Sequence, residues 1–424
     1  MPQYAAFLGH QPHVSIAELA ASIPGFALDK IVDQQVAMFS SSEELDPADL
    51  TQLGGCVLLA VRITQDAVGL EDIPQIIGKE TAHVKKKVTF GLRCFGLAPR
   101  EIKRAYHDSK EWLRKNEKPS RYIGNDHKPA ATALLHDAGV ISGKKGVELF
   151  LIVGEGGLWV GKTIAAQDIN AYTKRDMEKP VRDTTVGLLP PKLAQIMLNL
   201  GAWAATSAEL QATHVDEKTG AKPKRKKTVI YTVLDPFCGT GVIPLECLLR
   251  GWNVLASDSS VKAVNGCTKN IEWLRKEMKI FKKDVNDVVE KHDATKAFSF
   301  KQLPDMIVTE TSLGPALTKF PNQRDLKKLI SESEQLQAAF LTNVAQTVPG
   351  VPVVCIWPFW RAKGERYRLE KIWNALGKIG YTATLPDGIT AEDPAHPSLL
   401  YQRKDQFVGR EIVILKPTAS RNGK

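Results

Sequence analysis

The sequence predicts an α/β protein in which two small α+β regions precede a larger region built on a mostly parallel sheet. The chain has 424 residues, which is too long for one compact core and indicates two or three domains. From about residue 173 onward, apolar strands alternate with helical stretches, which is typical of a parallel sheet covered on both faces. Residues 4–70 and 84–172 each combine apolar strands with a helix-like stretch, which predicts a smaller α+β unit in each.

The first predicted domain, residues 1–72, contains one helix and three strands. The helix is expected at SIAELAASI (15–23), where Ser15 would cap the first turn and Glu18 would complete a capping box. The strands are expected at YAAFLGH (4–10), VAMFSS (36–41) and CVLLAVRIT (56–64).

The second predicted domain, residues 73–172, joins a helix to a basic surface. The helix is expected from about Glu101 to Lys115, because one of its faces would carry Ile102, Ala105, Ser109 and Leu113. Strands are expected at KKVTFGLRCFGL (86–97), VELFLIVG (147–154) and LWVGKTIAAQ (158–167). The basic side chains of this domain are Lys85–Lys87, Lys103, Arg104, Arg114, Lys115, Arg121 and Lys128.

The third predicted domain covers residues 173–424. Its elements include a helix at PPKLAQIMLNLGAWAA (190–205) and strands at TVLD (232–235), NVLAS (253–257), MIVTE (306–310) and VPVVCIW (351–357). Between the helix and the first of these strands, residues 213–228 are rich in Lys and Arg and lack an apolar period, which predicts an exposed loop. This loop is either a solvated linker or a segment that binds phosphates of a nucleic acid.

Composition and charge narrow the class of protein. The formal net charge of +10 and the pI near 9.1 suit a polyanionic partner such as nucleic acid. A membrane-spanning helix needs about 18 or more apolar residues in a row, and neither such a run nor a secretory signal pattern is present. The six cysteines show no CxxC spacing, so we expect reduced thiols, no metal site and a cytoplasmic location.

The stretch LDPFCGTGVIPLECLLRGWNVLASDSS, residues 234–260, places an acidic residue at the end of each of two strands and a glycine loop between them. A P-loop needs a lysine after its second glycine, and Gly241 is followed by Val242. A dinucleotide fingerprint needs a third glycine for close helix packing, and Pro244 stands there. Phosphate-bearing cofactors are therefore disfavoured, and S-adenosylmethionine, which has no phosphate, is the remaining candidate.

S-adenosylmethionine needs acceptors for an ammonium group, two ribose hydroxyls and an adenine amine. We expect Asp235 to face the ammonium, directly or through water, and Asp258 to accept from both ribose hydroxyls. Asp293 either accepts from the adenine amine or is a surface residue. The cofactor-binding residues predicted here are Asp235, Phe237, Gly239, Gly241, Asp258 and Asp293.

Two motifs and both ends of the chain resemble a known family. DPFCGTG resembles motif I of the amino-methyltransferases that modify exocyclic nitrogens of nucleic-acid bases. YTKRDMEKPVRDTTVGLLPPKLAQIMLNL is similar to the segment before motif I in the archaeal and eukaryotic tRNA guanosine N2-methyltransferases that act on position ten. YAAFLGHQPHVSIAEL and LLYQRKDQFVGREIVIL resemble the two ends of that family, so the resemblance spans nearly the whole chain.

This resemblance implies a fold and further contacts. It implies a ferredoxin-like domain at 1–72, a THUMP tRNA-binding domain at 73–172 and a Rossmann-like, seven-stranded methyltransferase domain at 173–424. It also implies that the PPKLA segment, with Pro190 and Lys192, covers the methionine end of the cofactor, although from the residues alone Pro190 and its neighbour Pro191 equally suit a helix start. The implied partner is tRNA, and the need for a small activating subunit is left open.

The chain departs from the family in one motif. Amino-methyltransferases of this type carry an (Asp/Asn)-Pro-Pro-(Tyr/Phe) loop after the fourth strand, which accepts hydrogens from the target amine and stacks on the flipped base. Thr309, Glu310, Thr311 and Ser312 stand at that place in this chain. Glu310 would be the acceptor, and these four are the candidate catalytic residues.

The departure leaves several hypotheses open. In the first, the chain is an S-adenosylmethionine-dependent tRNA (guanine-N2) methyltransferase, and an aromatic of the IWPFW stretch (356–360) replaces the lost stacking residue unless that stretch belongs to the core. In the second, it is a tRNA-binding protein with a vestigial cofactor pocket. An amino-methyltransferase of rRNA or DNA and a nicotinamide-dependent enzyme are further alternatives. The nine histidines are scattered and predict no catalytic role.

Overall fold

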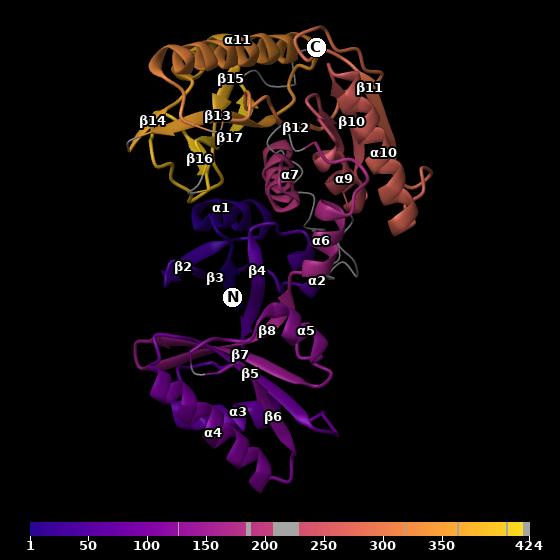
Figure 1. Ribbon diagram of the computed structural model, residues 1–424. Coiled ribbons are helices and arrows are strands. Elements are labelled where there is room, and N and C mark those ends of the chain that lie inside the picture. Colours follow the sequence, from indigo (N-terminus) through magenta and orange to yellow (C-terminus); the bar gives the residue numbers. More distant parts are fainter. Residues whose placement is uncertain are drawn as a thin grey trace, which may run out of the picture. The chain divides into compact units, whose positions relative to one another are not determined.

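The computed structural model describes two compact units of the chain (Figure 1). Unit 1 comprises Met1–Leu19 and Ile23–Tyr172, and unit 2 comprises Thr173–Lys424 with Ala20–Ser22. The described residues are 1–125, 127–183, 188–206, 229–317, 319–362, 364–403 and 406–418. The predicted basic loop at 213–228 lies outside the described residues.

Unit 1 contains one eight-stranded sheet with the strand order β2-β3-β1-β4-β8-β7-β5-β6. The strands are β1 (Gln3–Leu8), β2 (Ala27–Val32), β3 (Val36–Ser40), β4 (Cys56–Arg62), β5 (Val88–Phe95), β6 (Ser120–Ile123), β7 (Gly146–Gly154) and β8 (Gly157–Ala166). The helices are α1 (Pro12–Ser22), α2 (Pro47–Thr51), η1 (Leu70–Asp72), α3 (Ile73–Glu80), α4 (Pro99–Lys115) and α5 (Thr132–Asp137). Because β4 pairs with β8, the regions expected as two domains share one sheet, and a division at residue 72 stays a prediction.

The start of α1 differs from the expected one. The helix begins at Pro12, a residue tolerated in the first turn, and Gln11 occupies the N-cap position. Ser15 lies inside the helix, where its hydroxyl donates to the Gln11 carbonyl at 3.2 Å. Glu18 makes no capping box, because its buried carboxylate accepts from the backbone N–H groups of Gly54 at 2.8 Å and Gly55 at 2.7 Å.

Unit 2 contains a nine-stranded sheet whose main order is β11-β10-β9-β12-β13-β17-β15, and β14 and β16 pair at its side. The strands are β9 (Thr232–Asp235), β10 (Asn253–Asp258), β11 (Asp287–Lys291), β12 (Met306–Glu310), β13 (Val353–Ala362), β14 (Glu365–Tyr367), β15 (Tyr381–Ala383), β16 (Ser398–Tyr401) and β17 (Val408–Pro417). The run from β11 to β13 is parallel, and β17 is antiparallel to both β13 and β15. The expected mostly parallel sheet is confirmed.

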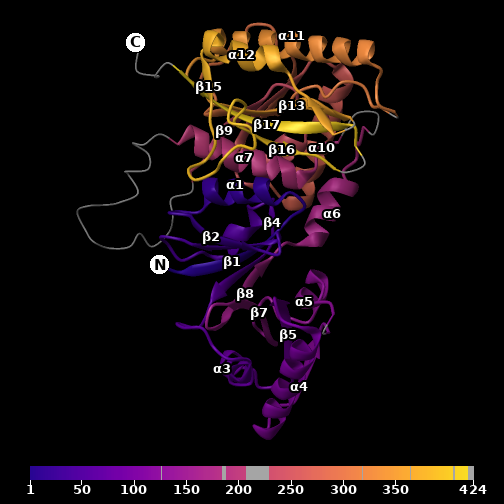
Figure 2. The same ribbon diagram turned by 90° about the vertical axis from the view of Figure 1, so that its left-hand side faces the viewer.

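Helices cover both faces of this sheet. They are α7 (Pro191–Ala205), α9 (Val242–Leu249), α10 (Val261–Met278), α11 (Gln323–Thr347) and α12 (Glu370–Ile379), and α6 (Ile169–Met177) precedes them in the chain. Figure 2 shows α11 and α12 on one face of the sheet and α7 on the other. The seven-strand order with one antiparallel strand and helices on both sides is that of a Rossmann-like methyltransferase fold, so the fold class predicted from the sequence is confirmed.

The aromatic residues of the IWPFW stretch lie within β13 and belong to the core. Trp357, Phe359 and Trp360 are all at most 1% exposed, because β13 continues through Ala362 and is covered on both faces. Trp357 packs edge-on against Trp373 of α12, with ring centroids 5.3 Å apart. The idea that one of these rings stacks on a substrate base is therefore wrong.

Candidate functional site

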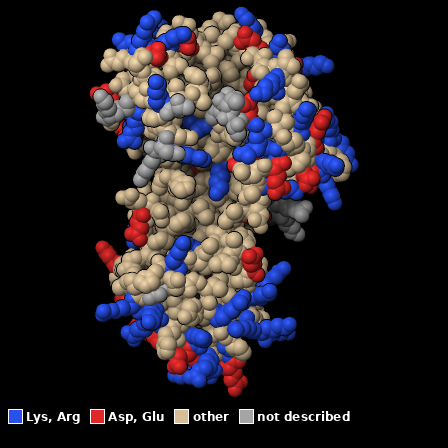
Figure 3. Space-filling model, in the orientation of Figure 1, with Lys and Arg blue, Asp and Glu red and all other residues tan. Residues whose placement is uncertain are grey.

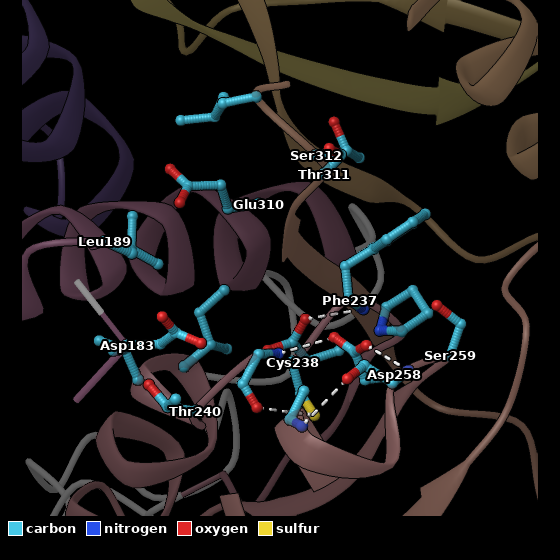
Figure 4. A pocket seen from close by; sticks show the side chains of 18 of the residues that line it. Asp183, Leu189, Phe237, Cys238, Thr240, Asp258, Ser259, Glu310, Thr311 and Ser312 are labelled. Atoms are coloured by element: carbon cyan, nitrogen blue, oxygen red, sulfur yellow. Dashed lines mark hydrogen bonds between the residues drawn. The ribbon is translucent and has the colours of Figure 1, made fainter. Parts of the chain in front are cut away.

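A cavity of about 680 Å³ opens at the carboxyl ends of β9, β10 and β12 (Figure 4). Ligands of open α/β sheets bind at this end of the strands, and the volume is typical of a cofactor-sized ligand. Among the residues predicted from the sequence, the lining includes Asp235, Phe237, Gly239, Asp258, Asp293, Glu310, Thr311 and Ser312. Pro190, Lys192, Gly241 and Thr309 are described but do not belong to the lining.

The two glycines of the loop have different structural reasons. Gly239 has φ +51° and Gly241 has φ +90°, a region that other residues adopt at a cost. A Cβ added to Gly239 would meet no atom within 4 Å, so its backbone faces open space beside the cavity. A Cβ on Gly241 would lie 2.7 Å from the Cys267 sulfur, so Gly241 allows α9 to begin close against α10.

Asp258 holds the glycine loop in place. Its Oδ2 accepts from the Gly239 backbone N–H at 3.0 Å, and its Oδ1 accepts from the Ser260 N–H at 2.9 Å. Ser260 in turn caps α10 by accepting from the Ala263 N–H at 3.4 Å. Each carboxylate oxygen has a second lone pair, so Asp258 can still accept hydrogen bonds from a ligand in the cavity.

Asp235 is a buried carboxyl at the end of β9, only 1% exposed. Thr309 donates its hydroxyl proton to Asp235 Oδ1 at 2.7 Å, and the Phe237 backbone N–H lies 3.4 Å from the same oxygen. Burial raises the pKa of Asp235 to about 7, the two hydrogen bonds oppose this rise, and the negative charges of Asp258 and Glu310 add to it. Thr309, expected among the catalytic residues, therefore contacts Asp235 rather than the cavity.

Glu310 is the ionisable residue of the Thr309–Ser312 segment, and its side chain lies across the cavity from Asp258 (Figure 4). It ends β12, and its Oε1 accepts from Arg410 Nε of β17 at 2.7 Å. Arg410 also donates from Nη2 to the Leu188 carbonyl at 3.2 Å. Burial raises the pKa of Glu310, and the guanidinium of Arg410 opposes the rise.

The last two residues of this segment have structural contacts. Thr311 is 1% exposed, donates to the Ile356 carbonyl at 2.7 Å and accepts from Gln337 Nε2 at 2.7 Å. Ser312 is exposed, and its hydroxyl accepts from the Gly314 N–H at 3.3 Å. Glu310 is thus the residue of this segment best placed to accept hydrogens from a substrate.

Asp293 follows β11 and forms a tight local turn. Its Oδ1 accepts from the Thr295 backbone N–H at 2.9 Å and from the Thr295 hydroxyl at 2.7 Å. These bonds lower the pKa of Asp293, which keeps the carboxylate ionised at the rim of the cavity. Its role toward a ligand stays a prediction.

A segment before α7 also lines the cavity, and sequence reasoning had not assigned Val181, Arg182, Asp183, Leu188 and Leu189 to it. Asn270 of α10, which is fully buried, fastens this segment. Its Oδ1 accepts from the Val181 N–H at 2.9 Å, and its Nδ2 donates to the Val181 carbonyl at 2.9 Å and the Thr240 carbonyl at 2.8 Å. Asp183 also pairs with Lys262 at 2.7 Å. No pattern in the sequence signals the contacts of Val181 and Asp183, because their partners are 79 to 89 positions away.

The described residues contain neither a metal-binding cluster nor a membrane-spanning helix. No group of three or more His, Cys, Asp or Glu side chains in the described ranges is arranged to hold a metal ion. None of the described helices combines the length and the apolar character needed to cross a bilayer.

Comparisons with known proteins gave one family and several structures. The family model described as Conserved hypothetical protein 95 matches residues 224–300, which include the glycine loop and Asp258. The chain is similar to TrmN from Thermus thermophilus, with 14% identity, a TM-score of 0.48, and coverage of 98% of this chain and 100% of that chain. It is similar to a possible methylase from Clostridium difficile 630, with 11% identity, a TM-score of 0.47, and coverage of 99% and 100%.

A third similar structure is a putative RNA methyltransferase from Pyrococcus horikoshii. Its identity to this chain is 15% and its TM-score is 0.30, and the match covers 57% of this chain and 93% of that chain. A search of curated proteins found no match.

Proposed function

We propose that this protein is an S-adenosylmethionine-dependent RNA methyltransferase that acts on the exocyclic N2 amine of a guanosine in tRNA, with position ten as the expected target. The observation that carries the proposal is the composition of one cavity. The glycine loop and Asp258 stand at one end of it, and the Glu310 carboxylate stands at the other (Figure 4). A cofactor cradle and a hydrogen-bond acceptor therefore face the same space.

The residues of the cradle fit S-adenosylmethionine. Asp258 supplies a carboxylate for the ribose hydroxyls, the open backbone of Gly239 admits close approach, and Asp235 supplies a buried carboxyl for the ammonium group. A buried carboxyl with a raised pKa is stabilised in its charged form by a nearby cation. When bound, the cofactor supplies an electrophilic methyl group on a sulfonium.

Glu310 provides what the target amine needs. An exocyclic amine is a weak nucleophile, because its lone pair is delocalised into the ring. Hydrogen bonding of the amine to Glu310 would orient the lone pair toward the methyl group, and positioning supplies most of the acceleration. Guanine presents N1–H and N2–H side by side, which suits a carboxylate acceptor. After transfer, the amine proton leaves through Glu310 or solvent.

The hydrogen bonds between Asn270 and Val181 lead to a prediction about cofactor binding. Asn270→Ala removes three hydrogen bonds and leaves the backbone groups of Val181 unpaired, a loss of about 1–3 kcal/mol. We expect the dissociation constant of S-adenosylmethionine to rise about 10-fold in calorimetric titration.

The matched control for that variant is Asn199→Ala. Asn199 is buried like Asn270, with 7% of its surface exposed, and its side-chain oxygen accepts a hydrogen bond from Arg250. It does not line the cavity. Equal weakening in both variants would show that the Asn270 effect is general destabilisation.

Unit 1 carries the surface proposed to bind RNA. Figure 3 shows Lys and Arg side chains gathered over the part of the unit that contains α4 and β6. The exposed members are Lys85, Lys86, Lys87, Lys103, Arg104, Arg114, Lys115, Arg121 and Lys128. Acidic neighbours on α4 partly neutralise Arg104 and Arg114, whereas the Lys85–Lys87 run precedes β5 and has no acidic residue beside it in the sequence.

Binding through phosphates predicts a steep dependence on salt. A protein that contacts about 6–10 phosphates loses roughly 10³- to 10⁵-fold in affinity between 50 and 200 mM salt. We expect the tRNA dissociation constant, measured by filter binding, to rise on this scale, and the log–log slope to fall when Lys85–Lys87 are changed together to Gln. An unchanged slope in that variant would place the RNA surface elsewhere.

The direct test of the function is transfer of labelled methyl groups to unmodified tRNA transcripts. We expect incorporation at guanosine N2, identified by nucleoside mass spectrometry, and none into duplex DNA. Incorporation into rRNA or DNA instead would identify a different amino-methyltransferase. Binding of both cofactor and tRNA without transfer would show a binding protein on a methyltransferase fold.

A further inference from the structure

The carboxylate at the reaction end of the cavity is held by an arginine from two strands away. Glu310 ends β12, and Arg410 lies on β17 opposite Pro358 of β13. Because β13 lies between β12 and β17, the guanidinium reaches across a whole strand, a span of two inter-strand spacings of about 4.8 Å each. Arg410 Nε then bonds to Glu310 Oε1 at 2.7 Å.

This ion pair is costly as a purely structural feature. The side chain of Arg410 is 6% exposed and that of Glu310 is 13% exposed, and buried pairs of this kind often stabilise a fold less than apolar residues of similar size. The position of this pair beside the cavity therefore explains its presence better than a contribution to the stability of the fold does. Among the described residues, Oε2 of Glu310 makes no hydrogen bond, so one carboxylate oxygen is held and the other is available to a ligand.

The second contact of Arg410 extends the arrangement to the wall of the cavity. Nη2 donates to the carbonyl of Leu188 at 3.2 Å, and Leu188 and Leu189 both line the cavity. The guanidinium thus donates to the carboxylate and to the wall of the cavity from two different nitrogens, which the single ammonium nitrogen of a lysine cannot do.

The charges around Glu310 come from several elements. Arg410 of β17 bonds to it directly, and Asp235, which ends the neighbouring strand β9, interacts with it electrostatically. The other charged groups that line the cavity are Arg182, Asp183, Asp258, Lys262 and Asp293. Asp183 and Lys262 pair with each other at 2.7 Å. Within the described part of the chain, Arg410 is the cation that pairs with Glu310.

We infer that Arg410 is a positioning residue that keeps Glu310 ionised and aims its Oε2 at the substrate base. The inference rests on the proposed function for its effect on the reaction. An ionised carboxylate accepts N–H groups and repels ring lone pairs, so this pair favours guanine, which offers N1–H beside N2–H, over adenine, whose N1 is an acceptor. Arg410 would therefore act on base selection as well as on rate.

The ionisation of Glu310 can be measured without any reaction. In protein labelled with carboxyl-¹³C glutamate, the NMR signal that disappears in Glu310→Gln is that of Glu310. We expect its titration midpoint to rise by at least one pH unit in Arg410→Met, and to stay near the wild-type value in Arg410→Lys, which keeps the charge. Equal midpoints in wild type and Arg410→Met would overturn the inference.

The matched control is Arg368→Met. Arg368 is 7% exposed and lies 3.5 Å from Glu411, the neighbour of Arg410 on β17, but neither residue lines the cavity. This variant should lose a comparable amount of stability and leave the Glu310 midpoint unchanged. A similar shift of the midpoint in Arg368→Met would show a general loosening of the sheet and would also overturn the inference.

Transfer assays then test the effect on the reaction. We expect the acid limb of the pH profile of kcat/KM to move upward in Arg410→Met by the same number of pH units as the midpoint, with little change in cofactor affinity. In Arg410→Met, the rate of methyl transfer to target RNA that carries adenine in place of the guanine should also rise relative to the rate with guanine. If wild-type protein transfers no methyl group, the proposed function fails while the NMR titration still decides whether Arg410 holds the charge of Glu310.

Discussion

Replacing Glu310 by Gln or Ala is expected to lower methyl transfer by about 10²- to 10³-fold while cofactor and tRNA binding change by less than about threefold. This range is typical for the removal of one acceptor or donor that acts on the transition state. Glu310 lines the cavity, but among the described residues its hydrogen bond goes to Arg410 and not to Asp258 or the glycine loop, which are proposed to hold the cofactor. The measurement is single-turnover transfer of labelled methyl to tRNA, beside calorimetric titration of cofactor.

This substitution leaves Arg410 buried without its partner, which by itself costs about 3–5 kcal/mol of stability. The matched control is Glu411→Gln, which disturbs a buried glutamate near Arg368 on the same strand but outside the cavity. The double variant Glu310→Gln/Arg410→Met removes the unpaired charge. If transfer recovers in the double variant, or falls equally in Glu411→Gln, Glu310 acts through stability and is not the acceptor.

The second large effect is expected from Asp235. Its pKa of about 7 lies well above that of an exposed aspartate, near 3.9, so the folded protein holds a proton there that the unfolded chain has already lost. Between these two pH values the folded state binds more protons, and the free energy of unfolding must therefore fall as pH rises from about 4 to about 7. The whole shift corresponds to an effect on the order of 4 kcal/mol.

Denaturant unfolding at several pH values without cofactor measures this effect. Other buried carboxyls, including Glu148, Glu246, Glu310 and Glu411, also have raised pKa values and contribute to the slope. The difference between wild type and Asp235→Asn isolates Asp235, because the asparagine does not titrate. A difference that is independent of pH between 4 and 8 would contradict the expected pKa.

Cofactor binding should show the complementary trend. The ammonium group of S-adenosylmethionine favours the ionised form of Asp235, so its affinity should rise as pH increases toward 7 and level off above it. Below pH 7 the affinity should fall by up to tenfold per pH unit, and Asp235→Asn should remove this dependence. Persistence of the same pH dependence in Asp235→Asn would assign it to another group.

Short-range patterns predicted much of unit 2. The strand at 306–310 has the expected bounds, and Asp235, Gly239 and Asp258 line one cavity, whereas Gly241 of the same loop does not. These features lie within about one strand–helix–strand unit, where alternation of apolar residues and the position of glycines determine the local structure.

In unit 1, the exposed edge strands β2 and β6 were not expected, because most of their residues contact solvent and carry no apolar period.

Side-chain partners that are distant in the sequence escaped prediction. Glu18 looked like part of a capping box, but the loop before β4 supplies two backbone donors to its carboxylate from 36 and 37 positions away. Thr309 looked catalytic, but β9 brings Asp235 within 2.7 Å of it. In both places a buried acid acquired hydrogen bonds that only the folded chain offers.

The sequence by itself determined the fold class, the glycine loop and the presence of a carboxylate where the amino-methyltransferases that it resembles carry their catalytic loop. The tertiary structure alone decided what that carboxylate contacts. Glu310 and Arg410 are 100 positions apart, and they meet because the sheet places β13 between β12 and β17. The order of the strands is determined by the packing of the whole domain, whereas a sequence motif predicts only the local backbone. The charge partner of Glu310 could therefore not be predicted from the sequence.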